Sequence, residues 1–247
     1  ADIILPASAH AEKNGTFTNT NRQVQMGRKV INPPGEAKED LVIISDLGKA
    51  LGLDWNYNHA SEVFNEMSKV MPSLNNISWE RVEKEDSVTY PCDDKNLPGN
   101  EIVFSQNFPT SSGLAKIVPT DLISPHELPD QNFPFVLTTG RLLEHWHTGA
   151  MTRRSNTLDN IEPEAIVNMN RLDMKNLKIE PGNKVQVKTR RGSIELSVRQ
   201  DTELPKGMIF IPFCFSEAAA NKLTNPQLDP FGKIPEFKYC AANIEAC

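Results

Sequence analysis

The sequence lacks the features that mark several specialised classes of protein. It has no apolar run close to the ~18 residues of a membrane-spanning helix. Hydrophobic residues make up 38% of the 247 positions and charged residues 23%, which excludes a fibrous or disordered chain. The net charge of −6, from 26 basic and 32 acidic residues, argues against a general nucleic-acid binder. These values indicate a globular chain of one or two domains.

Cysteine is scarce, and no two cysteines have the C-x-x-C spacing of a zinc knuckle or an iron–sulfur site. The four are Cys92, Cys214, Cys240 and Cys247. The sequence also begins without Met or a signal peptide, inside an apolar run that reads as a strand. We therefore expect free thiols, a cytoplasmic location and a chain that is the C-terminal fragment of a longer polypeptide.

The first half of the chain predicts a mixed segment of strands and helices. Residues 3–5 are expected to form a short buried strand, and residues 14–22 a loop. Apolar residues at helical spacing predict helices over 40–51 and 61–71. The proline-rich stretch 84–134 is expected to be a long connection with a short strand at 101–104, and we place a domain boundary within 122–132.

The second half predicts a β-rich domain. Strands are expected over 135–139, 165–169, 184–188, 194–198 and 208–212, with short helices over 171–177 and 216–223. A series of short strands with two small helices favours a closed barrel over a doubly wound sheet. Residues 141–200 hold 11 basic and 7 acidic residues, so a phosphate-rich ligand and an uneven solvated surface are about equally compatible with this charge.

The segment 138–154 directly after a predicted strand is unusually polar. It contains three arginines, two histidines, a tryptophan and two glycines: Arg141, Arg153, Arg154, His145, His147, Trp146, Gly140 and Gly149. Glycine lets a backbone approach phosphates, arginine binds them through two parallel hydrogen bonds, and histidine can donate to a heterocycle. The segment therefore predicts a binding site for an anionic cofactor.

Two other interpretations of this segment are weaker. Glu144, His145 and His147 could ligate a metal, but in a strand the glutamate would point away from the two histidines. Nucleophilic catalysis with a distant Ser or Cys has no supporting nucleophile-elbow motif. We therefore expect no metal ligand and no catalytic residue within the chain.

The same segment resembles the dinucleotide-binding segment of the molybdopterin oxidoreductase family, which includes formate dehydrogenases and nitrate reductases. Similar stretches extend along the chain, among them Thr16-Phe17-Thr18-Asn19, Leu223-Thr224-Asn225-Pro226 and Phe237-Lys238-Tyr239-Cys240-Ala241. These three favour the catalytic (alpha) subunit of cytoplasmic, NAD-linked formate dehydrogenases over nitrate reductases. Asn183 departs from a Pro-Gly-Asp turn, which affects the turn alone.

The resemblance implies an α+β fold in two parts. Residues 1–125 would be the tail of an α/β domain with a wrapping connection. Residues 126–247 would be a six-stranded, double-psi-type β-barrel, the molybdopterin dinucleotide-binding domain. It also implies a molybdenum or tungsten ion held by two molybdopterin guanine dinucleotides, and an iron–sulfur cluster bound by the missing N-terminal part.

The cofactor contacts implied by the resemblance lie in the polar segment and at three later positions. They are Thr139, Gly140, Arg141, Glu144, His145, Trp146, His147, Thr148, Phe213, Asn221 and Lys238. Phe213 would lie on the substrate side of the cofactor, while Asn221 and Lys238 would be further dinucleotide contacts. Each of these three also has a plain structural interpretation, as a core aromatic, a helix-internal hydrogen bonder and a solvated charge respectively.

The implied function is formate oxidation to CO2 by the whole subunit, with electrons passed through iron–sulfur and flavin subunits to NAD. Because no cysteine here is followed by histidine, the metal ligand of a formate dehydrogenase is absent and this chain alone should be inactive. The alternatives are a fragment of a nitrate reductase and a module that only binds the dinucleotide.

Overall fold

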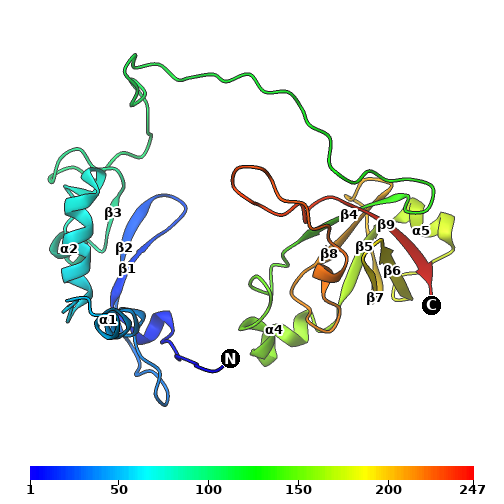
Figure 1. The fold of residues 1–247 in the computed structure, drawn as a ribbon, viewed down its shortest axis with the longest axis horizontal. Helices are drawn as coiled ribbons and strands as arrows, with labels where there is room; N and C mark the ends of the chain where they lie inside the picture. Colours follow the sequence, from blue (N-terminus) through cyan, green and yellow to red (C-terminus); the bar gives the residue numbers. More distant parts are fainter. The chain divides into compact units, whose positions relative to one another are not determined.

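The computed structural model describes residues 1–247, and the chain divides into two compact units, Ala1–Val118 and Pro119–Cys247. Figure 1 shows the helices of the first unit in blue and cyan and the strands of the second in green to red. No helix in the structure combines the length and the apolarity that crossing a membrane requires. The split falls seven positions before the predicted division between residues 125 and 126. The role predicted for each part stays a prediction.

The first unit holds three strands and three α-helices. The antiparallel sheet has the order β1-β2-β3, from β1 (Gly15–Thr18), β2 (Gln23–Gly27) and β3 (Ser87–Thr89). The helices are α1 (Asp40–Ala50), α2 (Ala60–Val70) and α3 (Trp79–Glu85), with 3-10 turns η1 (His10–Glu12) and η2 (Pro72–Leu74). Their core consists of Val24, Phe64, Leu74, Ile77, Trp79, Val82, Val88 and Cys92.

The predicted helices of this unit are confirmed, and three other predictions are wrong. Residues 3–5 form no strand, and Ile3 and Ile4 are more than three-quarters exposed. Residues 14–22 are not a simple loop, because β1 runs through them and pairs with β2. Residues 101–104 form bends, and no helix or strand lies between β3 and β4.

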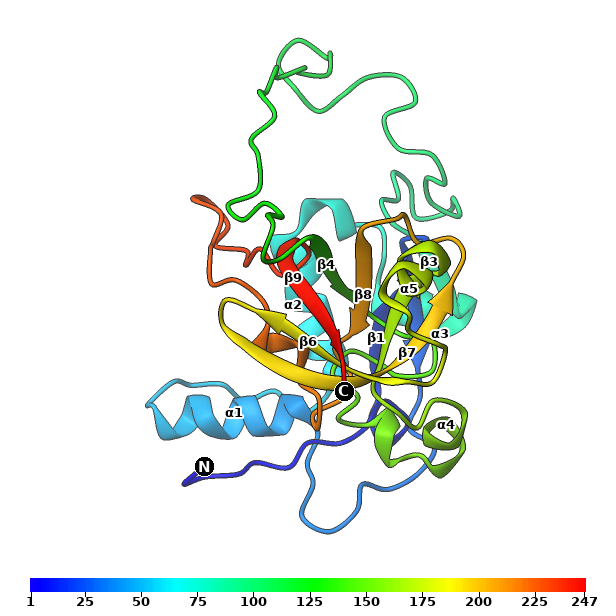
Figure 2. The ribbon, with the colours of Figure 1, turned by 90° about the vertical axis from the view of Figure 1, so that its right-hand side faces the viewer.

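The second unit is built around a closed six-stranded barrel, as predicted. Its strands are β4 (Phe135–Gly140), β5 (Ile166–Asn170), β6 (Lys184–Thr189), β7 (Gly192–Asp201), β8 (Met208–Pro212) and β9 (Cys240–Ala246). The order around the barrel is β4-β8-β5-β7-β6-β9, and β9 closes it against β4. The neighbours β4 and β8 are parallel, as are β5 and β7. Figure 2 shows these strands around one interior.

Alternation of apolar and polar residues explains the β6–β7 hairpin. Val185 and Val187 are fully buried, whereas Lys184 at the start of the strand is exposed and Gln186 between the two valines is only partly buried. Opposite them, Val185 pairs with Leu196 and Val187 with Ile194 across the antiparallel ladder. The barrel interior thus receives one face of each strand, and Leu137, Val167, Met169 and Ile209 fill it with no exposed surface.

Short helices connect the barrel strands. They are η3 (Thr152–Arg154), α4 (Asn156–Ile161), α5 (Arg171–Leu177) and η4 (Ala220–Lys222). The α5 helix has the predicted bounds, because the Asn170 side chain caps its first turn by accepting from Leu172 N at 2.8 Å. The helix predicted over 216–223 is reduced to the single turn η4, since residues 216–218 form a bend and a turn.

Candidate dinucleotide-binding site

Most predicted site residues lie where the parallel strands β4 and β8 end together. Thr139 pairs with Ile211, and Gly140 with Pro212, so the loops after both strands begin side by side. The backbone N–H of Phe213 donates to the Gly140 carbonyl at 3.1 Å. A Cβ on Gly140 would lie 2.4 Å from a ring carbon of Phe210, so only glycine fits here without movement of that ring. The barrel therefore fixes the starting points of both loops.

Arg141, Trp146 and His147 form an exposed cluster at the start of the first loop. The Arg141 guanidinium lies 5.8 Å from the centre of the Trp146 ring, and Arg141 Nη2 lies 3.2 Å from His147 Nε2. Because a guanidinium only donates, His147 Nε2 is the acceptor and its proton is on Nδ1. The two rings are 4.4 Å apart, and Trp146 is 59% exposed. A cation beside two accessible ring systems suits a ligand with a phosphate and a heterocycle.

Lys238 brings a second cation to the end of β4. Its ammonium donates to the Thr139 carbonyl at 2.7 Å, and the Thr139 hydroxyl donates to the Phe237 carbonyl at 2.8 Å. The ammonium also lies 5.4 Å from the centre of the Phe237 ring. Since an ammonium has three donors, this arrangement leaves two for an anion. The structure therefore places two predicted cofactor contacts, Thr139 and Lys238, directly against each other.

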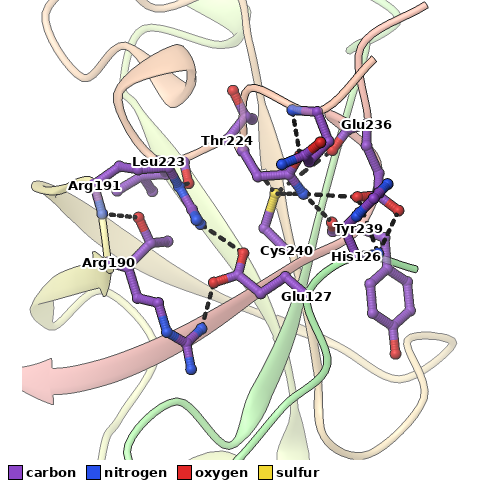
Figure 3. A network of polar contacts seen from close by, with 12 residues as sticks. His126, Glu127, Arg190, Arg191, Leu223, Thr224, Glu236, Tyr239 and Cys240 are labelled. Carbon is purple, nitrogen blue, oxygen red and sulfur yellow. Dashed lines mark hydrogen bonds and ion pairs between the residues drawn. The ribbon is translucent and has the colours of Figure 1, made fainter. Parts of the chain in front are cut away.

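The residue that holds the Lys238 segment was not predicted. Asn225 is buried, and its amide donates to Glu236 Oε2 at 3.0 Å and to the Tyr239 carbonyl at 3.2 Å, while its backbone N–H lies 3.3 Å from Cys240 Sγ. Figure 3 shows this network around Cys240, Tyr239 and Glu236. The sequence singled out the stretch Leu223-Thr224-Asn225 only because it resembles the family. In the structure, its Asn225 fixes the segment before β9.

A second part of this network attaches the start of the second unit to the β6–β7 turn. The Glu127 carboxylate accepts from Arg191 at 2.8 Å and also from Arg190, which pairs with Asp130 as well. Figure 3 shows Glu127 between the two arginines. Burial tends to raise the pKa of Glu127, but the hydrogen bonds from Arg191 and Arg190 outweigh it and hold the pKa below its usual value. A cleft of about 350 Å³ lies beside Glu127, and it is lined by Glu127, Arg190 and Arg191 together with His126, Leu128, Asn225, Pro226 and Gln227.

His145 is turned into the protein, away from the exposed cluster. It has no exposed surface; its Nε2–H donates to the Glu162 carbonyl at 2.8 Å, and its ring meets Phe215 edge to face at 5.8 Å. Its Nδ1 is buried without a hydrogen-bond partner. This geometry makes His145 an internal support of the loop.

Three predicted contacts, Glu144, Thr148 and Asn221, make no polar contact with the exposed cluster of Arg141, Trp146 and His147. Glu144 is half-buried, and no hydrogen bond or ion pair joins its carboxylate to the other predicted contacts. Thr148 and Asn221 are exposed, and no hydrogen bond joins either to the other predicted contacts. The two histidines of the Glu144–His145–His147 metal interpretation lie in different surroundings, since His145 is buried beside Glu162 and His147 is exposed beside Arg141.

The chemistry of the cluster at the end of β4 suits an anionic, heterocyclic ligand. The family model described as molydopterin dinucleotide binding domain matches residues 135–241, and the model described as molybdopterin oxidoreductase matches residues 1–50. The chain belongs to the molybdopterin oxidoreductase family, and the resemblance predicted from its motifs is confirmed.

Named relatives agree with this assignment. The chain is 47% identical over 247 residues to the F420-dependent formate dehydrogenase subunit alpha of Methanocaldococcus jannaschii, covering 99% of this chain and 37% of that protein. It is 34% identical to the assimilatory nitrate reductase catalytic subunit of Bacillus subtilis, covering 99% and 36%. The solved acetylene hydratase from Pelobacter acetylenicus shares the fold at 18% identity with a TM-score of 0.73, over 100% of this chain and 38% of that one. The chain thus spans little more than a third of each.

Proposed function

We propose that this chain is the C-terminal, cofactor-binding part of the catalytic subunit of a formate dehydrogenase. The observation that carries the proposal is the grouping of Arg141, Trp146, His147 and Lys238 at the end of β4. The family of the chain supplies the cofactor class, a molybdenum or tungsten ion held by two molybdopterin guanine dinucleotides. The identity to the methanogen subunit favours formate over nitrate as substrate.

The residues present fit one guanine dinucleotide of that cofactor. Arg141 would bind a phosphate through its planar fork, and Lys238 would pair with a phosphate or pterin oxygen as a point charge. Trp146 and His147 offer ring surfaces and a donor to the heterocycles, while Gly140, packed against the Phe210 ring, would contribute backbone groups only. Thr139 fixes the segment that carries Lys238, and Phe213 lies on the substrate side.

Four predicted contacts have more limited roles in this proposal. His145 would support the loop from inside, because its ring is buried against the Glu162 carbonyl and the Phe215 ring. Glu144 and Thr148 would border the site, and the Asn221 amide would read the edge of a heterocycle from η4. Each of these assignments stays a prediction.

The bound cofactor would supply the two-electron oxidation of formate to CO2. This chain would bind and orient it, while the iron–sulfur cluster and the metal ligand would be held by the rest of the catalytic subunit. The iron–sulfur and flavin subunits would carry the electrons onward. A cytoplasmic location stays a prediction of the sequence.

The final electron acceptor that we propose is F420 in place of the NAD predicted from the sequence. The support for this change is the name of the relative from M. jannaschii, which is F420-dependent and is identical to this chain at 47% of the 247 aligned positions. Nitrate reduction and dinucleotide binding without catalysis are the remaining alternatives.

The test uses the holoenzyme that contains this chain within its full catalytic subunit. We expect molybdenum or tungsten with two guanine nucleotides per subunit, and formate-dependent reduction of F420 that exceeds the reduction of NAD. Nitrate reduction without formate oxidation would replace the proposal by the nitrate reductase alternative. Bound guanine nucleotide without either activity would leave a binding module.

A further inference from the structure

Arg153 joins the loop after β4 to the segment after β8. It lies in η3, and its Nε donates to Asp159 Oδ1 in α4 at 2.7 Å. Its Nη1 donates to Glu217 Oε1 at 2.8 Å, 64 positions away in the chain. The two carboxylates thus occupy two edges of one guanidinium, whose side chain is only 22% exposed. An arginine held at both edges has little freedom to move.

The face of the same guanidinium is also occupied. It lies 4.7 Å from the centre of the Phe215 ring, which is 1% exposed and which also contacts the His145 ring. Phe215 is therefore held by two residues of the segment after β4, His145 and Arg153. Phe213, which we place on the substrate side of the cofactor, precedes Phe215 by two positions.

The loop approaches the β8 segment so closely that one position requires glycine. At Gly149 the backbone has φ of +72°, and a Cβ would lie 2.7 Å from the Cys214 carbonyl oxygen and 2.6 Å from Arg153 Cγ. The Arg153 backbone N–H also donates to the Gly149 carbonyl at 2.9 Å. Arg153 therefore closes the loop on itself and fixes it to its neighbour.

We infer that Arg153 is a positioning residue for the cofactor site, an inference that rests on the proposed function. It does not touch the cofactor. It sets the distance between two segments, the loop that carries Arg141, Trp146 and His147 and the segment that carries Phe213. The dinucleotide and the substrate side of the cofactor are thereby held in a fixed relative position. Loss of Arg153 removes both ion pairs at once and frees the loop while the barrel core remains intact, because no barrel strand is among its partners.

The neighbouring Arg154 provides a matched control. It has the same charge, lies in the same 3-10 turn and is exposed, and no side-chain hydrogen bond or ion pair involves it. The test compares Arg153→Ala, Arg153→Lys, Glu217→Gln and Arg154→Ala in the holoenzyme. The readouts are metal per subunit, guanine nucleotide released by acid, the melting temperature and proteolysis within residues 142–151 of cofactor-free protein.

We expect Arg153→Ala to contain about tenfold less metal and guanine nucleotide than the wild type, as when an outer residue that orients ligands is removed. Its loop should be cleaved faster, and Arg153→Lys and Glu217→Gln should show intermediate loading because each keeps one anchor. Arg154→Ala should match the wild type in every readout.

The result that overturns the inference is full loading of Arg153→Ala with wild-type proteolysis of the loop. If Arg153→Ala does not fold, full loading of both Arg153→Lys and Glu217→Gln overturns it. A wild-type enzyme without guanine nucleotide refutes the proposed function instead, and equal loop cleavage in Arg153→Lys and wild type would then refute the loop-fixing role as well.

Discussion

The ammonium of Lys238 donates to the backbone carbonyl of Thr139 at 2.7 Å, across 99 positions of the chain. The Thr139 hydroxyl returns a bond to the carbonyl of Phe237. This reciprocal pair locks the end of β4 to the segment that enters β9. The proposed cofactor site is thus assembled from segments that are adjacent only in the folded barrel.

Replacing Lys238 by alanine should weaken cofactor binding mildly. One cation is lost from the end of β4, but a lysine binds an anion as a point charge without a planar fork. We expect a loss of about 1 kcal/mol, or roughly fivefold in affinity. Metal content of the purified holoenzyme measures it, with Lys238→Arg as the charge-preserving control. An unchanged metal content would assign Lys238 to the β4 lock alone.

Replacing Arg141 by alanine should have a larger effect on the cofactor than on stability. The variant removes a charge-assisted partner of the phosphate, worth about 1.5–3 kcal/mol, or roughly ten- to a hundredfold in affinity. Because Arg141 is exposed and contacts only His147 and Trp146, the melting temperature should be nearly unchanged. Metal analysis beside a melting curve separates the two effects. A fully loaded but less stable variant would contradict the assignment.

The Glu127 carboxylate should make stability depend on acidity below pH 4.5. Its folded-state pKa lies below the ordinary value of 4.5, because Arg191 and Arg190 outweigh the effect of burial. The unfolded chain therefore takes up the proton first, so the stabilisation is complete above that ordinary value and is lost as the pH falls through the folded-state pKa. In urea titrations between pH 3 and 6, Glu127→Gln should lose this part of the pH dependence. If the unfolding free energies of the wild type and Glu127→Gln change with pH in parallel, the ion pairs of Glu127 contribute nothing to stability.

The four thiols should differ sharply in reactivity. Cys247 is exposed, whereas Cys92, Cys214 and Cys240 are buried, and burial raises the pKa of Cys214 to about 11. Since the thiolate is the reactive form, a thiol reagent at neutral pH should label Cys247 first. All four should react after denaturation without reductant. Mass spectrometry of the labelled peptides gives both counts, and a total of two would indicate a disulfide.

The 247-residue chain purified alone should oxidise no formate. It contains no Cys-His pair to ligate the metal, and the proposed clusters belong to the rest of the subunit. Formate-dependent reduction of a dye by this chain, at a rate above that of a preparation of Arg141→Ala, would contradict the assignment of those parts elsewhere.

Local patterns predicted the barrel better than the first unit. The β6–β7 hairpin follows from strict alternation, and α5 from its cap, so neighbouring residues contain all the information. Ile3–Leu5 failed because an apolar run shows only that a segment can be buried. β1 and β2 were missed because they are only four and five residues long, contain mostly polar residues and bury only Val24. Proline positions predicted the long connection, which begins after β3 in the structure and not at residue 84.

The site required information of another kind. Arg141 and Lys238 were predicted from motifs that resemble the family, and no periodicity could have placed them at the same strand end. The inward turn of His145 depends on Glu162 and Phe215, and the support by Asn225 depends on Glu236. These contacts are non-local and arise from tertiary packing, which a residue pattern does not encode.

The position of β9 between β4 and β6 has a consequence for synthesis. The barrel cannot close until Cys240–Ala246 has left the ribosome, because this strand alone bridges those two. The first five barrel strands wait as an open sheet with edges able to pair with other chains. Closure of the barrel also brings the Lys238 segment against the end of β4, so the proposed cofactor site is complete only after β9 has paired.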